Sequence, residues 1–519
     1  MEYSSVYWLF KDRVKKYAPD AHVFYSRSRG EWRGISWRRF EQETYDFATA
    51  LLSLDLKRGG TVCILMGNVP EWPISDIGTI IAGGVGVGLY PTSSAEQIAY
   101  IINHSDAEFV LVDSREQLQK VLSVREQLPT VRHIIALDTN YQDFIARGQT
   151  ERTRLASLLK ERAEGAGPDD IAILVYTSGT TGQPKGACLS HRYIINSVES
   201  LRQTIPIYDT DVSFSYLPFC HVAERISGLY NRLYAGASAY FVDDLARLGE
   251  YMLEVKPTVF ASLPRFFEKI YARIVSDGST NVKDYFGGRI RLLTSGGAPL
   301  PLEVAEFFAA AGLPILQAYG LTENVCVAFN RPDNYKFGTV GPPMPGCEVR
   351  LADDNEILVR SEMMFSGYYK APEETAKMFA DGWLLTGDLG EFDEDGFLKI
   401  IGRKKELIVT STGKKVSPTL LENMLKENHL ISQAMVYGEG RSYLVALITL
   451  NGPTEAVQDI VDKVNRRVSS TESIKRFAIL DRDFEIARDE ITPTGKLKRD
   501  VITERFRDVI EKLYTDKHR

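Results

Sequence analysis

Short apolar runs rich in β-branched residues alternate with segments of helical periodicity along much of the chain. The apolar runs, each four or five residues long, are 61–65, 109–112, 133–137, 171–175, 258–261 and 290–293. Residues 37–54 and 301–311 instead place apolar side chains at helical spacing, and Pro301 suits a first helical turn. Strands that alternate with helices are typical of layered folds, so the pattern predicts the α/β class.

Beyond Gly338 the pattern changes to short strands and tight turns. Runs 347–351 and 356–359 have the composition of strands, and the acidic sequence 393–396 predicts a turn between two more strands. These features predict a small β-rich subdomain at the end of the N-terminal part.

A third pattern, a compact mixture of helices and strands, ends in a charged amphipathic helix at about 500–514. A chain of 519 residues exceeds what one hydrophobic core usually organises. We therefore predict a large N-terminal domain of layered α/β subdomains (1–401), a hinge (402–405) and a smaller α+β C-terminal domain (406–519).

Composition narrows the expected partners to small molecules. A net charge of −7 and a pI near 5.7 argue against a nucleic-acid binder, which needs clustered Lys and Arg. The five cysteines form no Cys-x-x-Cys pair, which predicts free thiols in a reducing compartment. The first residues do not resemble a signal peptide, and the longest apolar stretch, 77–90, reads as a buried passage from helix to strand. We expect a cytoplasmic protein with at most peripheral membrane contact.

The run 176–186, Tyr-Thr-Ser-Gly-Thr-Thr-Gly-Gln-Pro-Lys-Gly, indicates phosphate binding. Glycines let backbone N–H groups approach an anion, hydroxyl groups add donors, and a lysine supplies a positive charge. Lys185 is followed by Gly186 and not by Ser or Thr, so this is not a Walker loop, and a Ser/Thr/Gly cluster alone also fits a flexible surface loop. The residues we expect at the phosphates are Thr177, Ser178, Gly179, Thr180, Thr181 and Lys185.

This run, with its Pro-Lys-Gly ending, resembles the signature of the adenylate-forming family, which includes acyl-CoA synthetases, luciferases and peptide-synthetase adenylation domains. Two later motifs resemble the same family. Ser-Gly-Gly-Ala-Pro at 295–299 is similar to its adenine shelf, which implies contacts from Gly297, Ala298 and Pro299.

The motif Gln-Ala-Tyr-Gly-Leu-Thr-Glu at 317–323 resembles the family's adenine and phosphate contacts. The resemblance implies that Gln317 and Ala318 line the nucleotide, that Tyr319 stacks on adenine and that Thr322 donates to the α-phosphate. It also implies that Glu323 holds Mg²⁺, with Thr177 completing the metal's shell, and Mg²⁺ does favour one or two carboxylates plus phosphate oxygens.

The resemblance extends to the end of the chain. Asp388 is similar to the family's ribose-binding carboxylate, with Arg403 as a second contact, and Lys405 matches the hinge residue. Lys496 matches the lysine that bridges the substrate carboxylate and the α-phosphate, where an ammonium offsets the charge of the in-line displacement.

The family implies a second half-reaction, in which a mobile C-terminal domain rotates and a thiol attacks the acyl-adenylate. Gly413 and Lys414 resemble the loop that then admits the pantetheine arm of CoA. Relatives with long-chain substrates often have two glycines where Thr412 and Gly413 stand here.

The segment Leu-Pro-Phe-Cys-His-Val-Ala-Glu-Arg at 217–225 resembles long-chain acyl-CoA synthetases, which implies that His221 and Ile226 line the acyl site. Residues 262–271, 365–372 and 483–499 look like the same subgroup. Many members of that subgroup carry a sizeable segment between the motif at 262–271 and the adenine shelf, whereas here only 272–293 intervene. The length of the acyl chain therefore stays open.

We expect an enzyme that converts an aliphatic, medium- or long-chain fatty acid to acyl-AMP and then to acyl-CoA, with ATP and CoA as co-substrates and Mg²⁺ as cofactor. A second hypothesis is an acyl-adenylate former that loads the phosphopantetheine of an acyl carrier protein. A third, a non-catalytic nucleotide-binding scaffold, conflicts with a complete set of charged site residues: Lys185, Glu323, Asp388, Arg403 and Lys496.

Overall fold

The computed structural model describes residues 2–177, 183–279, 281–428, 430–452, 456–492 and 495–515. Its largest sheet has six strands in the order β6-β5-β3-β4-β7-β8, parallel except for the last pair. The strands are β3 (Thr61–Leu65), β4 (Val85–Gly88), β5 (Phe109–Val112), β6 (His133–Ala136), β7 (Ile171–Thr177) and β8 (Lys185–Ser190).

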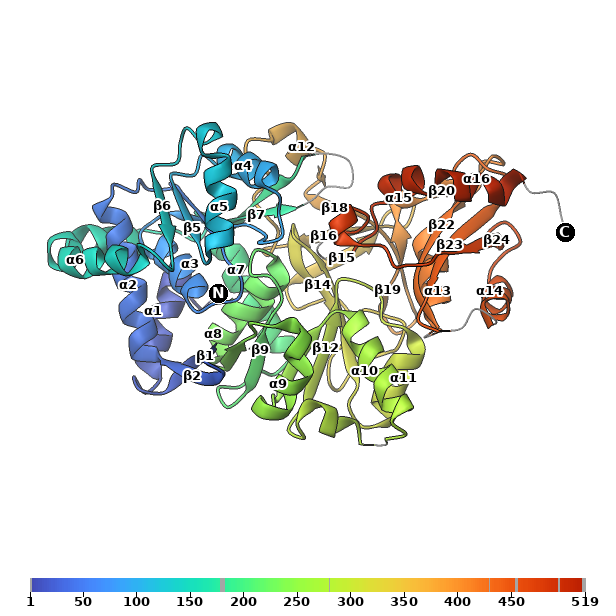
Figure 1. Cartoon of the computed structure of the whole chain (residues 1–519), viewed down its shortest axis with the longest axis horizontal. Coiled ribbons are helices and arrows are strands. Elements are labelled where there is room, and N and C mark those ends of the chain that lie inside the picture. The colour runs from blue at the N-terminus through green and yellow to red at the C-terminus, as the bar shows by residue number, and fades with distance from the viewer. Residues whose placement is uncertain are drawn as a thin grey trace.

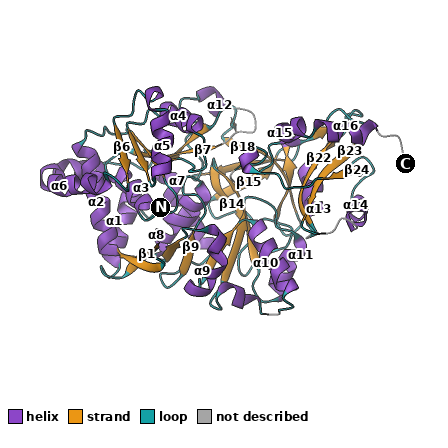
Figure 2. Ribbon diagram, in the orientation of Figure 1, coloured by secondary structure: helices purple, strands orange, loops and turns teal. Residues whose placement is uncertain are grey.

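Helices cover both faces of this sheet (Figures 1 and 2). One face packs on α2 (Trp37–Ser53), α3 (Glu71–Ile81), α6 (Tyr141–Glu164) and α7 (His191–Thr204). The other packs on α4 (Ala95–His104) and α5 (Arg115–Ser123). Strands buried on both faces are continuously apolar, which is why the pattern identified β3 and β5 with their observed bounds.

Two further sheets complete the α/β part. The first, β2-β1-β10-β9, comprises β1 (His22–Ser28), β2 (Glu31–Ser36), β9 (Val212–Ser215) and β10 (Ser238–Phe241). The second, β11-β12-β13-β14, comprises β11 (Val259–Ser262), β12 (Leu292–Gly296), β13 (Ile315–Leu321) and β14 (Asn324–Phe329). Their helices are α1 (Val6–Lys16), α8 (Asn231–Ala235), α9 (Leu248–Val255), α10 (Pro264–Ser276) and α11 (Leu302–Ala310), with the π-helix η2 (Ala223–Tyr230) before α8. Pro301 is the residue before α11 and not its first turn.

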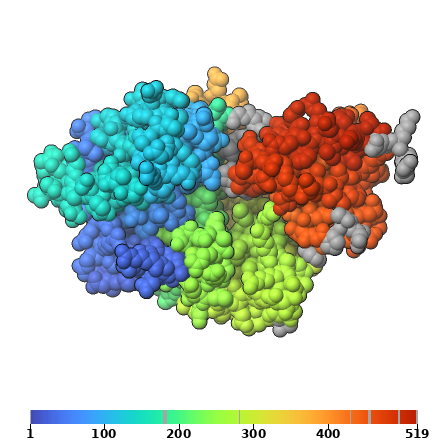
Figure 3. Space-filling model, viewed as in Figure 1, coloured from blue at the N-terminus to red at the C-terminus, as the bar shows by residue number. Residues whose placement is uncertain are grey.

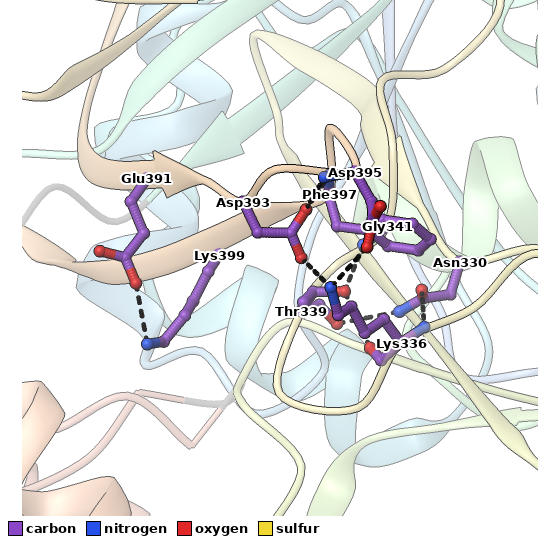
Figure 4. Close-up of polar contacts among 9 residues, drawn as sticks. All are labelled: Asn330, Lys336, Thr339, Gly341, Glu391, Asp393, Asp395, Phe397 and Lys399. Carbon is purple, nitrogen blue, oxygen red and sulfur yellow. Dashed lines mark hydrogen bonds and ion pairs between the residues drawn. The ribbon is translucent and has the colours of Figure 1, made fainter.

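The expected β-rich subdomain is a five-stranded antiparallel sheet. It comprises β15 (Cys347–Leu351), β16 (Glu356–Ser361), β17 (Phe379–Ala380), β18 (Trp383–Phe392) and β19 (Leu398–Arg403), with the short helix α12 (Pro372–Ala376) before β17. The acidic turn between β18 and β19 is held by Lys336, whose Nζ lies 2.6 Å from Asp393 and 3.0 Å from Asp395 (Figure 4). This contact ties a distant loop to the turn, so β18 and β19 are anchored at their outer end.

A smaller sheet, β22-β23-β24, organises the C-terminal part, which lies beside the larger part at one end of the molecule (Figures 1 and 3). Helices α13 (Pro418–Lys426) and α14 (Val457–Asn465) pack on one face, and α15 (Arg499–Arg505) and α16 (Arg507–Thr515) pack on the other. The strands of this sheet are β22 (Ile431–Tyr437), β23 (Leu444–Leu450) and β24 (Ile474–Ile479). A separate two-stranded sheet is formed by β20 (Ile408–Val409) and β21 (Lys415–Val416). The single last helix expected from the sequence is two helices, because the chain leaves helical geometry at Phe506.

The predicted class is confirmed: a large mixed α/β part with a β-rich subdomain, and a smaller α+β part. The limits 1–401, 402–405 and 406–519 stay a prediction. All five cysteines are free, and burial raises the pKa of Cys63 and Cys347 to about 12 and that of Cys188 to about 11. Within the described residues, no helix combines the length and apolarity that crossing a bilayer requires.

Candidate active site

Lys496 extends from the C-terminal part toward charged residues of the N-terminal part. It lies on a turn closed by a hydrogen bond from Thr492 N–H to Lys496 C=O, 2.8 Å long. Its ammonium interacts electrostatically with Arg403 and Asp388, and more weakly with Glu323. Desolvation and the Arg403 guanidinium lower the pKa of Lys496, although part of the residue is exposed to solvent. The sequence placed these residues far apart, and the structure brings them together.

Asp388 and Arg403 lie opposite each other on the paired strands β18 and β19. Arg403 Nε donates to one Asp388 oxygen at 2.7 Å, and the Tyr319 hydroxyl donates to the other at 2.6 Å. This carboxylate raises the pKa of Arg403 above its ordinary value, even though desolvation opposes the shift. The arrangement leaves a fixed carboxylate beside an aromatic ring, as a ribose and adenine would require.

The expected adenine shelf is an exposed turn after β12. Gly297 has a φ of +80°, a value that favours glycine, and Ala298 and Pro299 are exposed beside it. Gln317 is buried, and its amide oxygen accepts from Leu300 N–H at 3.1 Å. Gln317, on β13, therefore holds the backbone that follows the shelf. The neighbouring Ala318 is half-buried.

Thr322 and Glu323 form the turn between β13 and β14, and both are buried. The Tyr193 hydroxyl fixes this turn, because it donates to Thr322 C=O at 2.9 Å and accepts from Val325 N–H at 3.0 Å. The Glu323 carboxylate accepts a hydrogen bond from the Tyr368 hydroxyl.

Lys185 begins β8 directly opposite Thr177, the last residue of β7. Its ammonium is paired with Glu374 on α12 and lies 5.3 Å from the ring centroid of Tyr368. Lys185 and Lys377 lower the pKa of Glu374 to about 2. The expected phosphate contacts Ser178, Gly179, Thr180 and Thr181 lie outside the described residues.

His221 lies at the entrance to the π-helix η2 and is half-buried. Burial and the Lys496 charge lower its pKa to about 4, so the imidazole is neutral at physiological pH. Its Nδ1 accepts from Ala223 N–H at 3.2 Å, which assigns the ring proton to Nε2 and leaves that N–H as a donor. Ile226, one helical turn further, is fully buried in the main core.

The two charged residues after His221 are occupied by internal partners. Arg225 is fully buried and pairs with Asp76, which also accepts from Tyr230 at 2.7 Å. Glu224 is buried and pairs with Arg232. Neither charge is available to a ligand.

The helix that follows His221, η2, is a π-helix. A π-helix widens the helical turn by one residue, and such turns are frequent at functional sites.

Two groups of expected site residues are exposed to solvent. Gly413 and Lys414 form an exposed turn between β20 and β21, and Gly413 has the left-handed φ of +76°. The backbone hydrogen bonds of this turn join Thr410 to Gly413 and Lys414 within the C-terminal part. Lys405 is exposed in the short 3₁₀ turn η5 (Lys404–Glu406), which connects β19 to β20.

Sequence reasoning assigned no role to four residues that hold the site. They are Tyr193, Tyr368, Glu374 and Glu406. Tyr368 lies in the segment 365–372, whose resemblance marked it without a function. The other three act through contacts far apart in sequence, which no local pattern reveals.

The site therefore combines ammonium and guanidinium groups, buried carboxylates and an exposed shelf for a flat ring. Cations from three elements far apart in sequence, Lys185, Arg403 and Lys496, suit a polyanion that reacts with a second anion. Within the described residues there is no cluster of three or more His, Cys, Asp or Glu side chains that could hold a metal alone. A metal here would depend on ligands from the substrate.

The chain is similar to known proteins over nearly its whole length. Residues 10–369 match the AMP-binding enzyme family, and residues 405–518 match the AMP-binding enzyme C-terminal domain. The long-chain-fatty-acid–CoA ligase FadD15 of Mycobacterium bovis is 32% identical, covering 96% of this chain and 95% of the relative. The long-chain-fatty-acid–CoA ligase ACSBG1 of Rattus norvegicus is 30% identical, covering 99% and 86%.

Solved structures share the fold. The anthranilate CoA ligase AuaEII in complex with anthranoyl-AMP aligns with a TM-score of 0.84 and 23% identity over 97% of each chain. ATP-bound MatB from Rhodopseudomonas palustris aligns with a TM-score of 0.82 and 24% identity, covering 96% of this chain and 99% of MatB. The family model covers well over half of the chain, and the chain belongs to the AMP-binding enzyme family.

Proposed function

We propose that the protein is an AMP-forming fatty acid–CoA ligase. It activates an aliphatic carboxylic acid with ATP and transfers the acyl group to CoA, giving acyl-CoA, AMP and pyrophosphate. The observation that carries this proposal is the position of Lys496, whose charge interacts with Asp388 and Arg403 and also with His221. The names of the relatives FadD15 and ACSBG1 support the same reaction.

In the first half-reaction, a carboxylate oxygen attacks the α-phosphorus and the bond to the α,β-bridging oxygen breaks, so pyrophosphate leaves. Lys496 lies between the two anions and offsets their repulsion, which is electrostatic catalysis. Asp388 and Tyr319 position the ribose and adenine, while Thr322 and Lys185 contact the phosphates. Lys185 must exchange its partner Glu374 for a phosphate oxygen when ATP binds.

Glu323 fits a Mg²⁺ ligand, because its carboxylate is buried and accepts a hydrogen bond from Tyr368. Thr177 would add a hydroxyl to the metal's shell. Bound Mg²⁺ would neutralise charge on the phosphates and on the departing pyrophosphate. The low number of protein ligands suits this ion, which keeps waters and phosphate oxygens in its shell.

In the second half-reaction, the sulfur of CoA attacks the acyl carbonyl and AMP leaves with the bonding electrons, while the thiol proton passes to solvent. We propose that the C-terminal domain (406–519) rotates about Lys405 and brings Gly413 and Lys414 to the thiol's path. The exposure of this turn supports a second arrangement in which it is used.

The surroundings of His221 favour an acid without an amino group. A substrate ammonium would need an unpaired carboxylate, but Glu224 is already paired with Arg232. A neutral His221 with a free Nε2–H can instead donate to the substrate carboxylate, and Ile226 belongs to the apolar wall behind it. We propose a medium- or long-chain fatty acid, in the cytoplasm, with at most peripheral membrane contact.

The test is an acid panel. Purified protein with ATP, Mg²⁺ and CoA is expected to release AMP and pyrophosphate only when an aliphatic acid is present. A panel of saturated acids of increasing length, with an aromatic acid and an amino acid as controls, identifies the chain length. Absence of pyrophosphate with every carboxylate would refute the proposal.

A carrier protein is the second candidate acceptor. The A-PCP didomain of the carboxylic acid reductase from Segniliparus rugosus shares the fold with a TM-score of 0.81 and 22% identity, covering 98% of this chain and 82% of that one. Turnover of free CoA decides between the acceptors, because a loader of carrier proteins forms acyl-AMP but leaves free CoA unconsumed.

A further inference from the structure

Arg265 and Asp483, two residues that the proposed function leaves without a role, meet between the two parts of the chain. Arg265, in the first turn of α10, donates from Nη2 to Asp483 Oδ2 at 2.6 Å and reaches Ser432 Oγ at 3.4 Å. Asp483 follows β24 and Ser432 lies on β22, so both belong to the C-terminal part. The contact joins the segments 262–271 and 483–499, which the sequence marked separately.

Hydrogen bonds within the C-terminal part fix the orientation of the Asp483 carboxylate for this contact. Its carboxylate accepts from Thr449 Oγ1 at 2.6 Å and from Ser432 Oγ at 2.8 Å. Burial alone would raise the pKa of Asp483, but the hydrogen bonds from Thr449, Arg265 and Ser432 outweigh it and lower the pKa. The next residue, Phe484, is fixed to the Gln433 side chain by its backbone N–H at 2.6 Å.

A rigid path leads from Asp483 to the turn that carries Lys496. Arg482 binds the fully buried Glu490 with two hydrogen bonds of 2.7 Å, and Arg505 binds it at 2.9 Å. Glu490 C=O accepts from Lys498 N–H at 2.8 Å, which closes the base of that turn. Asp483 and Lys496 therefore move as one block.

We propose that Arg265 is a positioning residue that docks this block on α10 and so holds Lys496 in the site during adenylation. The inference rests on the proposed two-step reaction and adds to it the contact that selects the first arrangement. About half of the Arg265 side chain is exposed, and partly exposed ion pairs are weak. A weak ion pair suits this role, because the contact must break in every catalytic cycle.

The experiment separates the half-reactions in Arg265→Ala and Arg265→Met. Adenylation, measured as acid-dependent exchange of pyrophosphate into ATP, is expected to fall about two- to fivefold, the range of one partly exposed pair. Thiolation of supplied acyl-AMP is expected to stay level or rise. Arg265→Lys should recover part of the adenylation rate, and added salt should lower the wild-type rate toward that of Arg265→Ala.

Arg273→Ala is the matched control, because Arg273 lies on the same helix and, among the described residues, forms an ion pair only with Asp277, 3.8 Å away and just past the end of α10. It should leave both half-reactions unchanged. Equal losses in both half-reactions for Arg265→Ala, or no loss in either, would overturn the proposal. If the wild-type protein forms no acyl-AMP, the proposed function fails instead.

A measurement independent of activity tests the docking itself. Dyes on Gln149→Cys in α6 and Asp459→Cys in α14, both exposed positions, report the distance between the two parts by energy transfer, with Cys188→Ser as background. Arg265→Ala is expected to broaden or shift the distribution of the nucleotide-free protein, whereas Arg273→Ala is not. An unchanged distribution would overturn the inference whatever the enzyme's activity.

Discussion

Lys496 owes its proposed role to its neighbours, because an ordinary lysine in a basic stretch would be solvated. Lys496→Ala is expected to lower the adenylation rate by about a hundred- to a thousandfold, which corresponds to roughly 3–4 kcal/mol of lost electrostatic stabilisation. Thiolation of supplied acyl-AMP should be nearly unchanged. The measurement is pyrophosphate exchange beside single-turnover thiolation.

The matched control is Lys498→Ala, since Lys498 is paired with Asp489 and not directed at the site. It should leave adenylation close to wild type. Equal loss of both half-reactions in Lys496→Ala would contradict the assignment of Lys496 to the first step alone.

A second residue-scale prediction concerns stability and pH. His191 is buried, its Nδ1 accepts from Val6 N–H at 3.3 Å, and burial lowers its pKa to about 4. The unfolded state therefore binds more protons between the ordinary pKa of about 6.5 and pH 4, so stability falls as the pH falls through this window. Across this window, protonation of His191 is expected to lower the free energy of unfolding by on the order of 3 kcal/mol.

The measurement is the free energy of unfolding in urea at several pH values from 7 to 4. His191→Gln keeps an acceptor for Val6 N–H but cannot titrate, so its stability should depend less on pH. His22→Gln, at an exposed position on β1, should keep the wild-type slope. A His191→Gln slope equal to that of wild type would contradict the prediction.

Residue types were predictable, but their partners were not. The sequence identified Lys185, Asp388 and Lys496 because charged groups in glycine-rich or turn-forming motifs suggest anion binding. It did not identify Glu374, because the contact between Lys185 and α12 spans 189 positions along the chain. Pairings of that kind depend on how the sheets pack, which no local pattern encodes.

At the scale of elements, β4 sets the place of His221. A Cβ added at Gly88 would lie 2.7 Å from Cys220 Cα and 2.8 Å from its Cβ, so the backbone before His221 packs directly on this strand. Gly88→Ala is expected to destabilise the protein by about 1–3 kcal/mol, because backbone must shift to relieve the clash. It should also raise the KM for the acid more than that for ATP.

Thermal unfolding and steady-state kinetics check this prediction. Gly249→Ala in α9 is the control, because nothing lies within 4 Å of a Cβ there and alanine favours a helix. Its stability should be equal or slightly higher. A tolerated Gly88→Ala with an unchanged KM for the acid would show that the strand does not position His221.

Buried strands were the most predictable elements, and irregular helices the least. Continuous apolar runs between turn residues predicted the observed bounds of β3 and β5, and the alternating run 347–351 predicted those of β15. The sequence pattern did not predict the π-helix η2, because its wider turn breaks the 3.6-residue spacing and its buried charges interrupt the apolar face. The break between α15 and α16 at Phe506 was also not predicted, since the amphipathic periodicity continues through it.

At the scale of the whole molecule, the short segment between β19 and β20 is the proposed hinge between the two half-reactions. Arg403 has φ −118° and ψ 130°, the extended conformation that proline requires of the preceding residue, and Lys404 begins the 3₁₀ turn η5. Lys404→Pro therefore fits the present arrangement and stiffens it. Adenylation should persist, while thiolation should fall on the order of tenfold or more.

Lys404→Ala is the control, because it removes the ion pairs with Asp354 and Glu356 without restricting φ. It should retain both half-reactions. The two variants are compared in single-turnover assays that start from acid and ATP or from supplied acyl-AMP. Loss of adenylation in Lys404→Pro would mean that the segment bends differently from the proposed hinge.

The inertness of the protein's own thiols has a practical consequence. A protonated sulfhydryl is a poor nucleophile, and burial raises the pKa of all five cysteines, so their thiols stay protonated at neutral pH. A chromogenic aromatic disulfide added to the reaction should then colour only with the free coenzyme, so its consumption can be followed continuously without a protein blank. Slow extra colour in the absence of coenzyme would measure how often the native structure opens.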